Sequence, residues 1–383
     1  MRVMHVLHPG PTGGLEQVVE QLAGGRAREG RPTAAVMTCF AAGQATGLET
    51  KLRASGVRVK RVEVGGRDYW GERRQIAAFA KSWQAEVIHS HGYRADIVSW
   101  GIAQAIGGVS VSTAHGFTGG DLRNRLYERL QQWAWRGVDT VVAVSEPLRA
   151  RLVNAGVPER KVAVVRNAWS GGEPALNREQ AREELGIAGP RCWIGWVGRL
   201  SAEKAPELML RALSGLPASV GLVMVGDGRE RASLEALAQS LGIAGRVRFA
   251  GLLPDAAQRM KAFDLLVLSS RTEGTPMVLL EAMAAQVPVA ATRVGGVPQM
   301  LNEREAYLAE PEAESLTFQI QLALSDSTEA QRRASAARRR LEQSAGRTAW
   351  MAAYESLYRS GADASCAQAA VSPIGARHNW KDA

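Results

Sequence analysis

The sequence predicts two doubly wound α/β domains in tandem, and three observations support this fold class. Short apolar runs of strand length alternate with helix-length segments throughout the chain, which indicates parallel sheets covered on both faces. The alternation restarts after Ser170-Gly171-Gly172-Glu173-Pro174, a stretch that is typical of a linker. The 383 residues are also more than one hydrophobic core usually organises.

The first half of the chain holds seven strand candidates, each a short and mostly apolar run. Helix-length segments lie between them, for example Glu16–Arg28 and Leu122–Arg136. The expected strands are Arg2–Leu7, Ala34–Cys39, Val57–Val62, Glu86–His89, Val109–Thr113, Thr140–Val144 and Val162–Arg166.

Five more strand candidates follow the linker, separated by helices such as Glu207–Leu213 and Arg229–Leu241. Thr275 and Pro276 are typical of an N-cap and a first helical position, which predicts a helix from Met277 to Gln286. The expected strands are Cys192–Val197, Val220–Val225, Val247–Ala250, Leu265–Leu268 and Val287–Ala291.

The domain boundaries follow from this alternation. We expect a first domain of residues 1–170 and a second domain of residues 171–345. Past Glu312 the chain is helical and charged up to about Tyr358, so a terminal helix is expected over 346–361. The small and polar residues 362–383 predict a mobile tail.

The composition is that of a soluble globular protein, with 46% hydrophobic and 22% charged residues. Apolar runs such as Val278–Leu280 are far too short to span a bilayer. We expect no signal peptide, because Val3–Leu7 is followed at once by a Pro/Gly turn. The three cysteines, at positions 39, 192 and 366, lack pairing or metal-ligand spacing, which suits a reducing cytosol.

The net charge of +9 lies entirely in the first half of the chain. Residues 1–170 hold 23 Lys and Arg against 14 Asp and Glu, whereas the remaining 24 basic and 24 acidic residues cancel. A basic half-protein can face anionic lipid, nucleic acid or phosphorylated substrates, and a solubilising surface charge is the alternative. No dense Lys/Arg run with interleaved aromatics supports a nucleic-acid partner.

The first loop that could carry chemistry is Pro9-Gly10-Pro11-Thr12-Gly13-Gly14-Leu15-Glu16, between a strand and a helix. Glycines let a backbone approach a ligand closely, and a helix N-terminus offers free N–H donors with a partial positive charge. A phosphate would fit there, and a simple tight turn is the alternative. The dinucleotide fingerprint G-x-G-x-x-G is absent.

The second loop runs from Trp196 to Lys204, again from the end of a strand toward a helix. If the loop is tight, Arg199 and Lys204 converge on one point. Two fixed cations beside a helix N-terminus would clamp a diphosphate. A solvated loop with ordinary surface charges is the alternative.

The third stretch contains two acids, Glu273 and Glu281, in otherwise almost wholly apolar surroundings. Glu281 would project from a helix packed inside a domain, where a carboxylate is costly unless something binds it. It lies roughly 7 Å along the helix from the start, about the distance from a diphosphate to the far edge of a ribose. Two vicinal hydroxyls would offset its burial. The alternative is a salt bridge to an arginine such as Arg293.

The histidines form a fourth group, because His89, His91 and His115 end or follow strands. With His8 they could share one rim, so a zinc site has to be considered. No carboxylate or cysteine lies at helpful spacing, which favours single polar roles in a substrate cleft. Asp-x-Asp occurs nowhere in the chain, so we expect no metal to hold a nucleotide diphosphate.

Taken in order, each at an expected strand end, these motifs resemble the retaining, nucleotide-sugar-dependent glycosyltransferases of family 4. The likeness covers nearly the whole chain up to about Tyr358. It implies the GT-B fold, two tandem Rossmann-like doubly wound domains facing across a cleft. The motifs that carry it are Gly13-Gly14-x-Glu16, His89 to Gly92, Ala114 to Gly116, Val144 to Glu146, Val197 to Lys204, Val225 to Gly228 and the pair Glu273 and Glu281.

The resemblance also implies roles for individual residues. His115 would lie beside the sugar near the anomeric carbon, and Glu273 would contact sugar and phosphate, either as a nucleophile or only as a binding group. His91 and Gly13 are candidates on the acceptor side, and the terminal helix would cross back onto the first domain. The donor-binding residues it implies are Gly14, Arg199, Lys204, Leu253, Thr275, Met277, Val278 and Glu281.

Two positions depart from the family pattern. Many relatives have Pro-Asn-Gly where this chain has Arg166-Asn167-Ala168, which puts the local turn and any acceptor contact there in doubt. Ala205 replaces the usual glycine after Lys204, a change expected to be harmless.

We therefore expect a cytoplasmic, retaining glycosyltransferase that uses a nucleoside-diphosphate sugar without metal or other cofactor. The acceptor would be a saccharide or lipid-linked alcohol of cell-surface polysaccharide or glycolipid synthesis, reached at the inner membrane face, with no nucleic acid involved. Another GT-B nucleotide-sugar enzyme, such as an epimerase, and a non-catalytic nucleotide or anionic-surface binder are the alternatives. The motifs do not select the base, the sugar, the acceptor or the oligomeric state.

Overall fold

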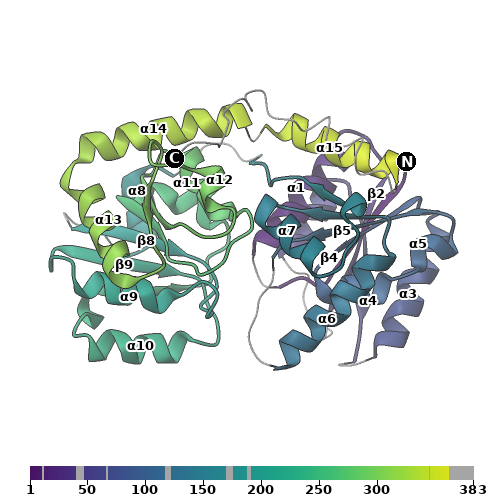
Figure 1. Cartoon of the computed structure of the whole chain (residues 1–383), viewed down its shortest axis with the longest axis horizontal. Coiled ribbons are helices and arrows are strands. Elements are labelled where there is room, and N and C mark those ends of the chain that lie inside the picture. Colours follow the sequence, from purple (N-terminus) through teal and green to yellow (C-terminus); the bar gives the residue numbers. More distant parts are fainter. Residues whose placement is uncertain are drawn as a thin grey trace.

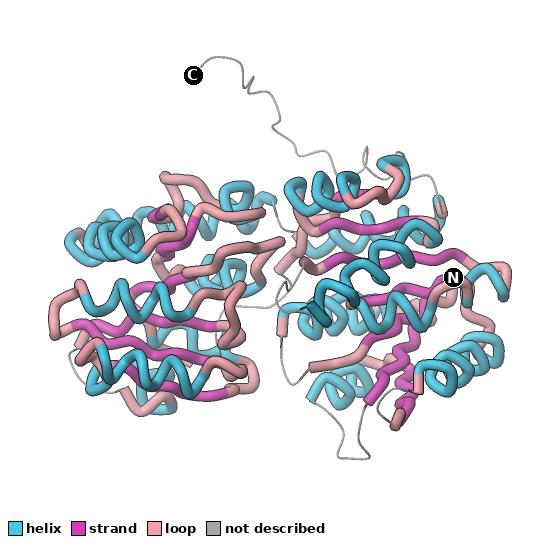
Figure 2. The backbone as a smooth tube through the Cα atoms, turned by 60° about the horizontal axis from the view of Figure 1, so that its bottom comes forward, coloured by secondary structure: helices cyan, strands magenta, loops and turns pink. Residues whose placement is uncertain are grey.

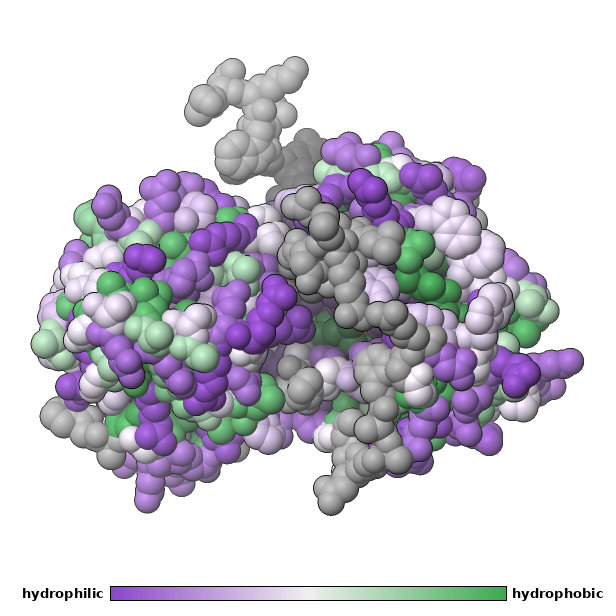
Figure 3. Space-filling model, turned by 90° about the horizontal axis from the view of Figure 1, so that it is seen from below, coloured by the Kyte–Doolittle hydropathy of each residue, from purple (hydrophilic) through white to green (hydrophobic). Residues whose placement is uncertain are grey.

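Two α/β units lie side by side in the structure, a computed structural model (Figure 1). The space-filling view shows a hollow between them on one face of the molecule (Figure 3). The structure describes residues 1–10, 13–39, 47–65, 68–116, 122–169, 176–187, 191–344 and 346–361. The expected linker at Ser170–Pro174 and the expected mobile tail at 362–383 lie outside the described residues.

The first unit is built on a parallel seven-stranded sheet in the order β3-β2-β1-β4-β5-β6-β7. Every residue of β1 and β4 is buried, because helices cover both faces of the sheet (Figure 2). The strands are β1 Val3–Leu7, β2 Thr33–Cys39, β3 Arg58–Glu63, β4 Val87–His91, β5 Val109–Ala114, β6 Thr140–Ala143 and β7 Val162–Val164. The helices are α1 Gly14–Arg28, α2 Gly47–Ala54, α3 Tyr69–Ser82, α4 Tyr93–Ser99, α5 Ile102–Ala105, α6 Leu122–Gly137 and α7 Glu146–Asn154.

The second unit repeats this architecture with a parallel six-stranded sheet in the order β10-β9-β8-β11-β12-β13. Its strands are β8 Cys192–Val197, β9 Val220–Val225, β10 Val247–Gly251, β11 Leu265–Leu268, β12 Val289–Thr292 and β13 Tyr307–Ala309. Its α-helices are α8 Arg178–Glu184, α9 Pro206–Ser214, α10 Arg231–Ser240, α11 Met277–Ala285, α12 Val297–Met300 and α13 Ala313–Ser325.

Two long helices close the chain and connect the units along one edge of the molecule (Figure 1). Helix α14 (Ser327–Ser344) lies against α11 of the second unit, and its buried residues recur at the helical spacing Ala330, Ala334, Ala337 and Leu341. Helix α15 (Arg347–Ser360) lies on the first unit.

Three side chains hold α15 against the first sheet. Tyr358 contacts His89 of β4 through its hydroxyl at 2.8 Å, and Tyr354 contacts Thr113 of β5 at 3.3 Å. The carboxylate of Glu355 forms a buried ion pair with Arg26 of α1. Because a buried ion pair broken on one side leaves an uncompensated charge, this contact fixes where α15 can dock.

The predicted fold class is confirmed: the chain forms two doubly wound α/β units, and every expected strand lies within two residues of an observed one at each end. Strand β13 was missed, because three residues are too few to show a periodicity. Among the described helices, none combines the length and the apolar composition needed to cross a bilayer.

Candidate functional site

The predicted loops meet where the strand order of each sheet reverses. In the first sheet β1 lies beside β4, and in the second sheet β8 lies beside β11. Connections leave such neighbouring strands toward opposite faces, which opens a crevice at the carboxyl ends of the strands. Gly13 follows β1, Lys204 follows β8 and Glu273 follows β11, so all three lie at these reversal points.

Two helices begin next to one another across the interface between the units. A side chain placed on Gly14, the first residue of α1, would lie 3.5 Å from Cγ of Met277, the first residue of α11. Neither helix has a side-chain hydrogen bond at its N-cap, Gly13 in α1 and Pro276 in α11. The first N–H groups of both helices therefore lack an intrahelical partner and form an electropositive region suited to an anion.

The loop before α1 folds back on itself through Glu16. The backbone N–H of Gly10 donates to the Glu16 carboxylate at 2.7 Å, and a Cβ on Gly13 would lie only 2.7 Å from the same carboxylate. The extended backbone of Gly13 does not itself demand glycine, but a side chain there would require the Glu16 carboxylate to move. Pro11 and Thr12, which complete the predicted loop, lie outside the described residues.

The prediction that Thr275 caps α11 is wrong. The N-cap is Pro276, and the Thr275 hydroxyl donates instead to the carbonyl of Val144, at the end of β6 in the other unit. The side-chain amide of Asn167 also donates to the carbonyl of Thr275, at 3.1 Å. The Thr275 hydroxyl, which the local pattern assigned to the helix, is therefore bonded to the other unit. Together the contacts with Val144 and Asn167 hold the start of α11 against the first unit.

Lys204 and Glu273, both predicted to contact the donor, lie against each other. The Lys204 ammonium lies 2.6 Å from the Glu273 carboxylate, which also accepts from the Ser270 hydroxyl at 2.6 Å. The Glu273 side chain is only 5% exposed, so the lysine compensates a nearly buried charge. Arg199 does not join them: its side chain is exposed, and within the described residues no hydrogen bond or ion pair involves its guanidinium.

Glu281 is buried in α11, as the sequence suggested, and it contacts the first unit. Its carboxylate accepts a 2.8 Å hydrogen bond from the side-chain amide of Gln17 on α1. Burial raises the pKa of Glu281, the bond from Gln17 lowers it, and the negative charge of Asp255 raises it. The alternative salt bridge with Arg293 is wrong, because Arg293 pairs with Glu303 at 2.6 Å instead.

The loop that carries Lys204 contains a residue in an unfavourable conformation. Ala205 has φ 45° and ψ 52°, in the left-handed region, and its side chain is fully buried. A left-handed conformation brings Cβ close to a carbonyl oxygen and costs roughly 1–2 kcal/mol in a non-glycine residue. The expectation that alanine is harmless at this position therefore fails on backbone geometry.

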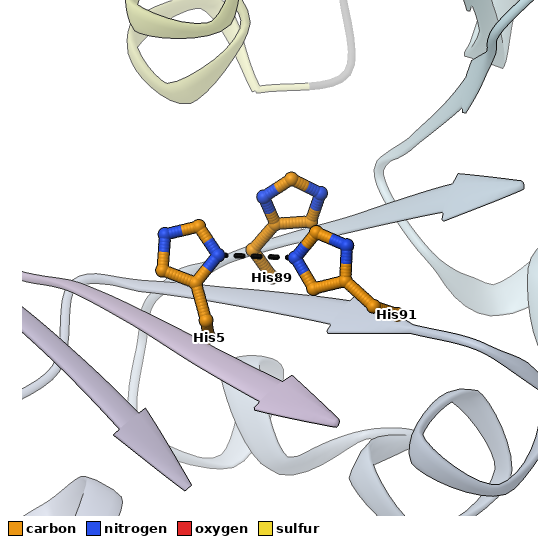
Figure 4. Close-up of side chains that lie close together, drawn as sticks. All are labelled: His5, His89 and His91. Atoms are coloured by element: carbon orange, nitrogen blue, oxygen red, sulfur yellow. Dashed lines mark hydrogen bonds between the residues drawn. The ribbon is translucent and has the colours of Figure 1, made fainter. Parts of the chain in front are cut away.

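Three of the histidines, His5, His91 and His115, are joined by contacts between their ring nitrogens, whereas His89 binds α15. His115 Nε2 lies 3.2 Å from His91 Nδ1. His91 Nε2 in turn lies 3.0 Å from His5 Nδ1, the contact that Figure 4 marks. His89 is bonded through both ring nitrogens, at 2.8 Å each, to Thr113 and to Tyr358. His8, which directly follows β1, lies against Thr38 of β2 at 3.3 Å, and its expected place on a common rim with the other histidines stays a prediction.

Burial keeps these imidazoles neutral. It lowers the pKa of His5 to about 3 and that of His115 to about 4, and it holds the pKa of His91 and His89 well below 6.5. The positive charge of Arg26 adds to the effect on His5. Neutral imidazoles at physiological pH can donate from one nitrogen and accept at the other.

His5, His89 and His91 offer one nitrogen each within 4.8 Å of one another, a spacing that makes a metal site conceivable. Of their six ring nitrogens, five already take part in hydrogen bonds, and His5 Nε2 is the one without a partner among the described residues. A metal would have to break most of these bonds, so the donor set fits a hydrogen-bonded cluster better.

Leu253, the predicted base contact, is half-buried and precedes Pro254. A cavity of about 470 Å³ beside it is lined by Leu176, Pro254, Asp255, Gln258 and Arg259. Asp255 also contacts Lys51 of α2 at 2.5 Å, which places this rim of the second unit against the first. Val278, the remaining predicted donor contact, is half-buried in the first turn of α11.

Sequence reasoning missed Gln17, Ser270 and His5, which lie in the site or in contact with it. Gln17 and Ser270 are polar residues in stretches that no motif covers, and their partners lie on other elements. His5 stands inside the apolar run Val3–Leu7, where a histidine in a buried strand was the available signal.

Comparison with known proteins gives consistent matches for both units. Residues 12–169 match the family model described as Glycosyltransferase Family 4, and residues 177–340 match the model described as Glycosyl transferases group 1. Among solved structures, Anabaena Alr3699/HepE in complex with UDP-glucose superimposes with a TM-score of 0.82 at 22% identity, covering 94% of this chain and 100% of that one. WaaG, a glycosyltransferase involved in lipopolysaccharide biosynthesis, gives 0.71 at 19% identity, covering 89% and 95%.

Two curated relatives are more similar in sequence over part of the chain. The D-inositol 3-phosphate glycosyltransferase of Mycobacteroides abscessus is 28% identical over 293 residues, which are 67% of this chain and 65% of that protein. The lipopolysaccharide core biosynthesis glycosyltransferase LpsE of Rhizobium meliloti is 31% identical over 171 residues, 45% of this chain and 49% of that protein. The matched regions thus span less than two thirds of these relatives' own length.

Proposed function

Because this chain belongs to the family 4 glycosyltransferases, which retain anomeric configuration and have the GT-B fold, we propose that it transfers a sugar from a nucleoside diphosphate to an acceptor hydroxyl. One observation carries the proposal: the uncapped N-termini of α1 and α11 meet at the strand-order reversals of both sheets. A diphosphate is the anion that two such helix ends, with Lys204 beside them, would hold.

The donor would then extend along α11. Glu281, one turn into the helix, would accept from the two ribose hydroxyls, which would replace Gln17 as hydrogen-bond donors. The backbone around Leu253 would meet the base, next to the cavity that Pro254 lines. Thr275, Met277 and Val278 would present the start of α11 to the sugar and phosphates. Arg199, whose side chain is exposed in the loop after β8, would add a second cation.

The chemistry would take place between Glu273 and His115. The carbonyl oxygen of His115 lies 3.2 Å from where a Cβ on Gly274 would stand. His115 therefore borders the same part of the crevice as Gly274, the residue that follows Glu273. The acceptor oxygen would attack the anomeric carbon on the face from which the diphosphate leaves. The bond from carbon to phosphate oxygen breaks, and the acceptor proton passes to a phosphate oxygen. Charge on the leaving group would be neutralised by Lys204 and the helix ends, without a metal.

Glu273 would serve to position Lys204 and the sugar. Its carboxylate is already engaged by Lys204 and Ser270, which is an arrangement for binding rather than for attack. Gly13 would face the acceptor from the first unit. His91, the other acceptor-side candidate, is buried with both ring nitrogens bonded to His5 and His115, so it would act on the site through His115.

The test is a thermal-shift screen of UDP, GDP, ADP and dTDP and their common sugars, followed by turnover. A ligand at 100 times its dissociation constant should stabilise the protein by about 2.7 kcal/mol. The expected result is stabilisation by one nucleoside diphosphate and its sugar, with nucleotide release that depends on an added acceptor alcohol. Nucleotide release that needs no acceptor would favour an epimerase-type reaction, and binding without turnover would leave only a binding protein.

We further propose that the acceptor is anionic or linked to lipid and is reached at the inner face of the membrane. The excess of +9 in residues 1–170 would attract such an acceptor. The two curated relatives are named for D-inositol 3-phosphate and for lipopolysaccharide core synthesis, which are phosphate-bearing or lipid-linked acceptors.

Exposed aromatic side chains on α3, on α6 and next to α4 support contact with a membrane surface. Trp70 is 83% exposed, Trp133 is 54% exposed, and Trp133 packs against Trp100 with ring centroids 4.7 Å apart. Tryptophans are favoured at the interface between lipid and water, where a basic protein surface is also attracted to anionic headgroups.

Co-sedimentation with phosphatidylglycerol vesicles at low salt measures this contact. The wild type should bind, and the double variant Trp70→Ala, Trp133→Ala should bind much less. Phe318→Ala, which removes an aromatic side chain 62% exposed on α13 of the other unit, is the matched control and should bind normally. Equal recovery of all three proteins in the supernatant would contradict the membrane proposal.

A further inference from the structure

Three histidines from three different strands or strand ends form a continuous chain of nitrogen contacts. His5 lies on β1, His91 ends β4, and His115 follows β5 directly. The links are His5 Nδ1 to His91 Nε2 at 3.0 Å and His91 Nδ1 to His115 Nε2 at 3.2 Å. The chain therefore runs from the buried centre of the sheet, where His5 has no exposed surface, to the crevice, where His115 is half-buried.

Each link constrains the tautomer of both rings that it joins. A neutral imidazole carries one N–H, so a nitrogen–nitrogen hydrogen bond needs a proton on one side and a lone pair on the other. Only two arrangements satisfy both links. In the first, protons lie on His5 Nδ1 and His91 Nδ1, and His115 keeps its own proton on Nδ1. In the second, all three rings carry the proton on Nε2.

The surroundings of His5 favour the first arrangement. His5 Nε2 is buried and has no hydrogen-bond partner among the described residues. In the second arrangement that nitrogen would be an orphaned N–H donor, whereas in the first it is an acceptor without a partner, which buried protein tolerates more often. The positive charge of Arg26, close enough to lower the pKa of His5, also favours a lone pair there over an N–H.

We propose that His5 and His91 are positioning residues that fix His115 as the Nδ1–H tautomer, so that His115 donates a hydrogen bond to the bound sugar. The hydrogen bond from His115 to the sugar rests on the glycosyl-transfer function proposed above, but the tautomer of His115 does not. The tautomer of His5 constrains that of His91, which in turn constrains that of His115. Replacing either His5 or His91 therefore removes the constraint on His115. Low pKa values keep all three rings neutral at physiological pH, so the arrangement persists there.

His89 stands beside this chain without belonging to it. Its ring centroid lies 4.1 Å from that of His91, but its nitrogens bond Thr113 and Tyr358. Figure 4 shows the three imidazoles of His5, His89 and His91 grouped over β1 and β4, with the hydrogen bond between His5 and His91 alone. His89 thus anchors α15, while His5 and His91 act on His115.

Nitrogen-15 NMR of histidine-labelled protein tests the proposal without relying on activity. The signals of His115 are assigned from a His115→Asn variant, and protonated and unprotonated ring nitrogens differ strongly in chemical shift. Wild-type His115 should show the proton on Nδ1 in the protein without ligand. A proton on Nε2 of His115 would overturn the proposal. So would a shift of the His5 and His91 nitrogens on addition of Zn²⁺, because the group would then be a metal site.

Two variants of His5 separate positioning from folding. His5→Leu cannot donate to His91, so a population of the Nε2–H tautomer of His115 should appear. His5→Asn keeps a donor near the position of Nδ1 and should restore the Nδ1–H tautomer. If both variants keep the wild-type tautomer, His5 plays no part. If His5→Leu does not fold, the same comparison is made with His91→Asn, which keeps a donor for His115, and His91→Leu, which does not.

Turnover completes the test. His5→Leu should lower kcat for sugar transfer roughly 3- to 10-fold, the value of one hydrogen bond, while the affinity for the free nucleoside diphosphate stays unchanged. His5→Asn should recover most of the loss. A loss of nucleotide affinity equal to the loss of kcat would indicate general damage and overturn the proposal. If the wild type transfers no sugar at all, the proposed function fails, and the NMR result still decides the role of His5 and His91.

Discussion

The side-chain amide of Gln17 donates a 2.8 Å hydrogen bond to the carboxylate of Glu281, across 264 residues of sequence and between the two units. It supplies a hydrogen bond to an acid that is only 3% exposed. The contact therefore couples the position of α1 to that of α11. When ribose hydroxyls bind Glu281, they compete with Gln17, so nucleotide binding and the packing of the two units are linked.

The pH dependence of stability tests the state of Glu281. Burial raises the pKa of Glu281 above its ordinary 4.5, so the folded protein holds this proton more tightly than the unfolded chain does. The contribution that this tighter proton binding by Glu281 makes to the unfolding free energy is present below about pH 4.5 and is lost as pH rises through the raised pKa. Glu281→Gln should therefore become progressively more stable than the wild type between pH 4.5 and neutrality, as measured by urea unfolding without ligand.

Glu303→Gln is the matched control, because Glu303 is exposed and a hydrogen bond from Arg293 lowers its pKa. The contribution of the ionised Glu303 to the unfolding free energy is present above pH 4.5 and is lost as pH falls. The stability difference between Glu303→Gln and the wild type should therefore change with pH in the opposite direction. A difference between Glu281→Gln and the wild type that is constant with pH would show that Glu281 does not titrate in this window.

Lys204→Met should weaken nucleotide binding and destabilise the protein. The variant leaves the Glu273 carboxylate, 5% exposed, with the Ser270 hydroxyl but without its cation. The loss of a charged hydrogen bond should cost about 1–3 kcal/mol in unfolding free energy, and nucleoside diphosphate affinity should fall roughly 10- to 100-fold. Isothermal titration and urea unfolding measure the two effects.

Arg332→Met provides the comparison for Lys204→Met, because Arg332 pairs with Glu329 on the outside of α14. Exposed ion pairs contribute little to stability, so neither measured quantity should change appreciably. If Lys204→Met behaves like Arg332→Met, then Lys204 is a solvated surface cation rather than part of a diphosphate site.

Ala205→Gly should stabilise the protein. Glycine relieves the left-handed strain at φ 45°, and this gain exceeds the larger conformational entropy that glycine has in the unfolded chain. The expected increase in unfolding free energy is roughly 0.5 kcal/mol, and Ala205→Val should lower it. Urea unfolding of the three proteins gives the order, and a glycine variant less stable than wild type would show that the loop is not strained.

Much of the fold was predictable because parallel strands buried on both faces leave continuous apolar runs such as Val220–Val225. The positions of Lys204 and Glu273 were also predictable, since the carboxyl ends of parallel strands share one edge of a sheet. The roles of these residues remain proposals.

What the sequence could not predict depends on contacts between distant elements. The local pattern assigns the Thr275 hydroxyl to the start of α11, and only the packing of the two units shows that it donates to the Val144 carbonyl instead. The bond between His5 and His91 depends on the pairing of β1 with β4, in which His5 lies opposite His89 and Leu7 lies opposite His91. Arg199 and Lys204 are close in sequence, but within the described residues only Lys204 pairs with Glu273, so a diphosphate contact shared by the two cations stays a prediction.

The central claim is that Glu281 grips the ribose of a nucleoside diphosphate held between α1 and α11. Isothermal titration of UDP, or of whichever diphosphate stabilises the protein in the screen, and of its 2′,3′-dideoxy form tests this claim in wild type and Glu281→Gln. The wild type should bind the dideoxy form roughly 10- to 100-fold more weakly, and Glu281→Gln should bind both forms equally weakly. If removing the two hydroxyls and replacing Glu281 each weaken binding, and their losses of binding free energy add when Glu281→Gln binds the dideoxy form, the account is contradicted.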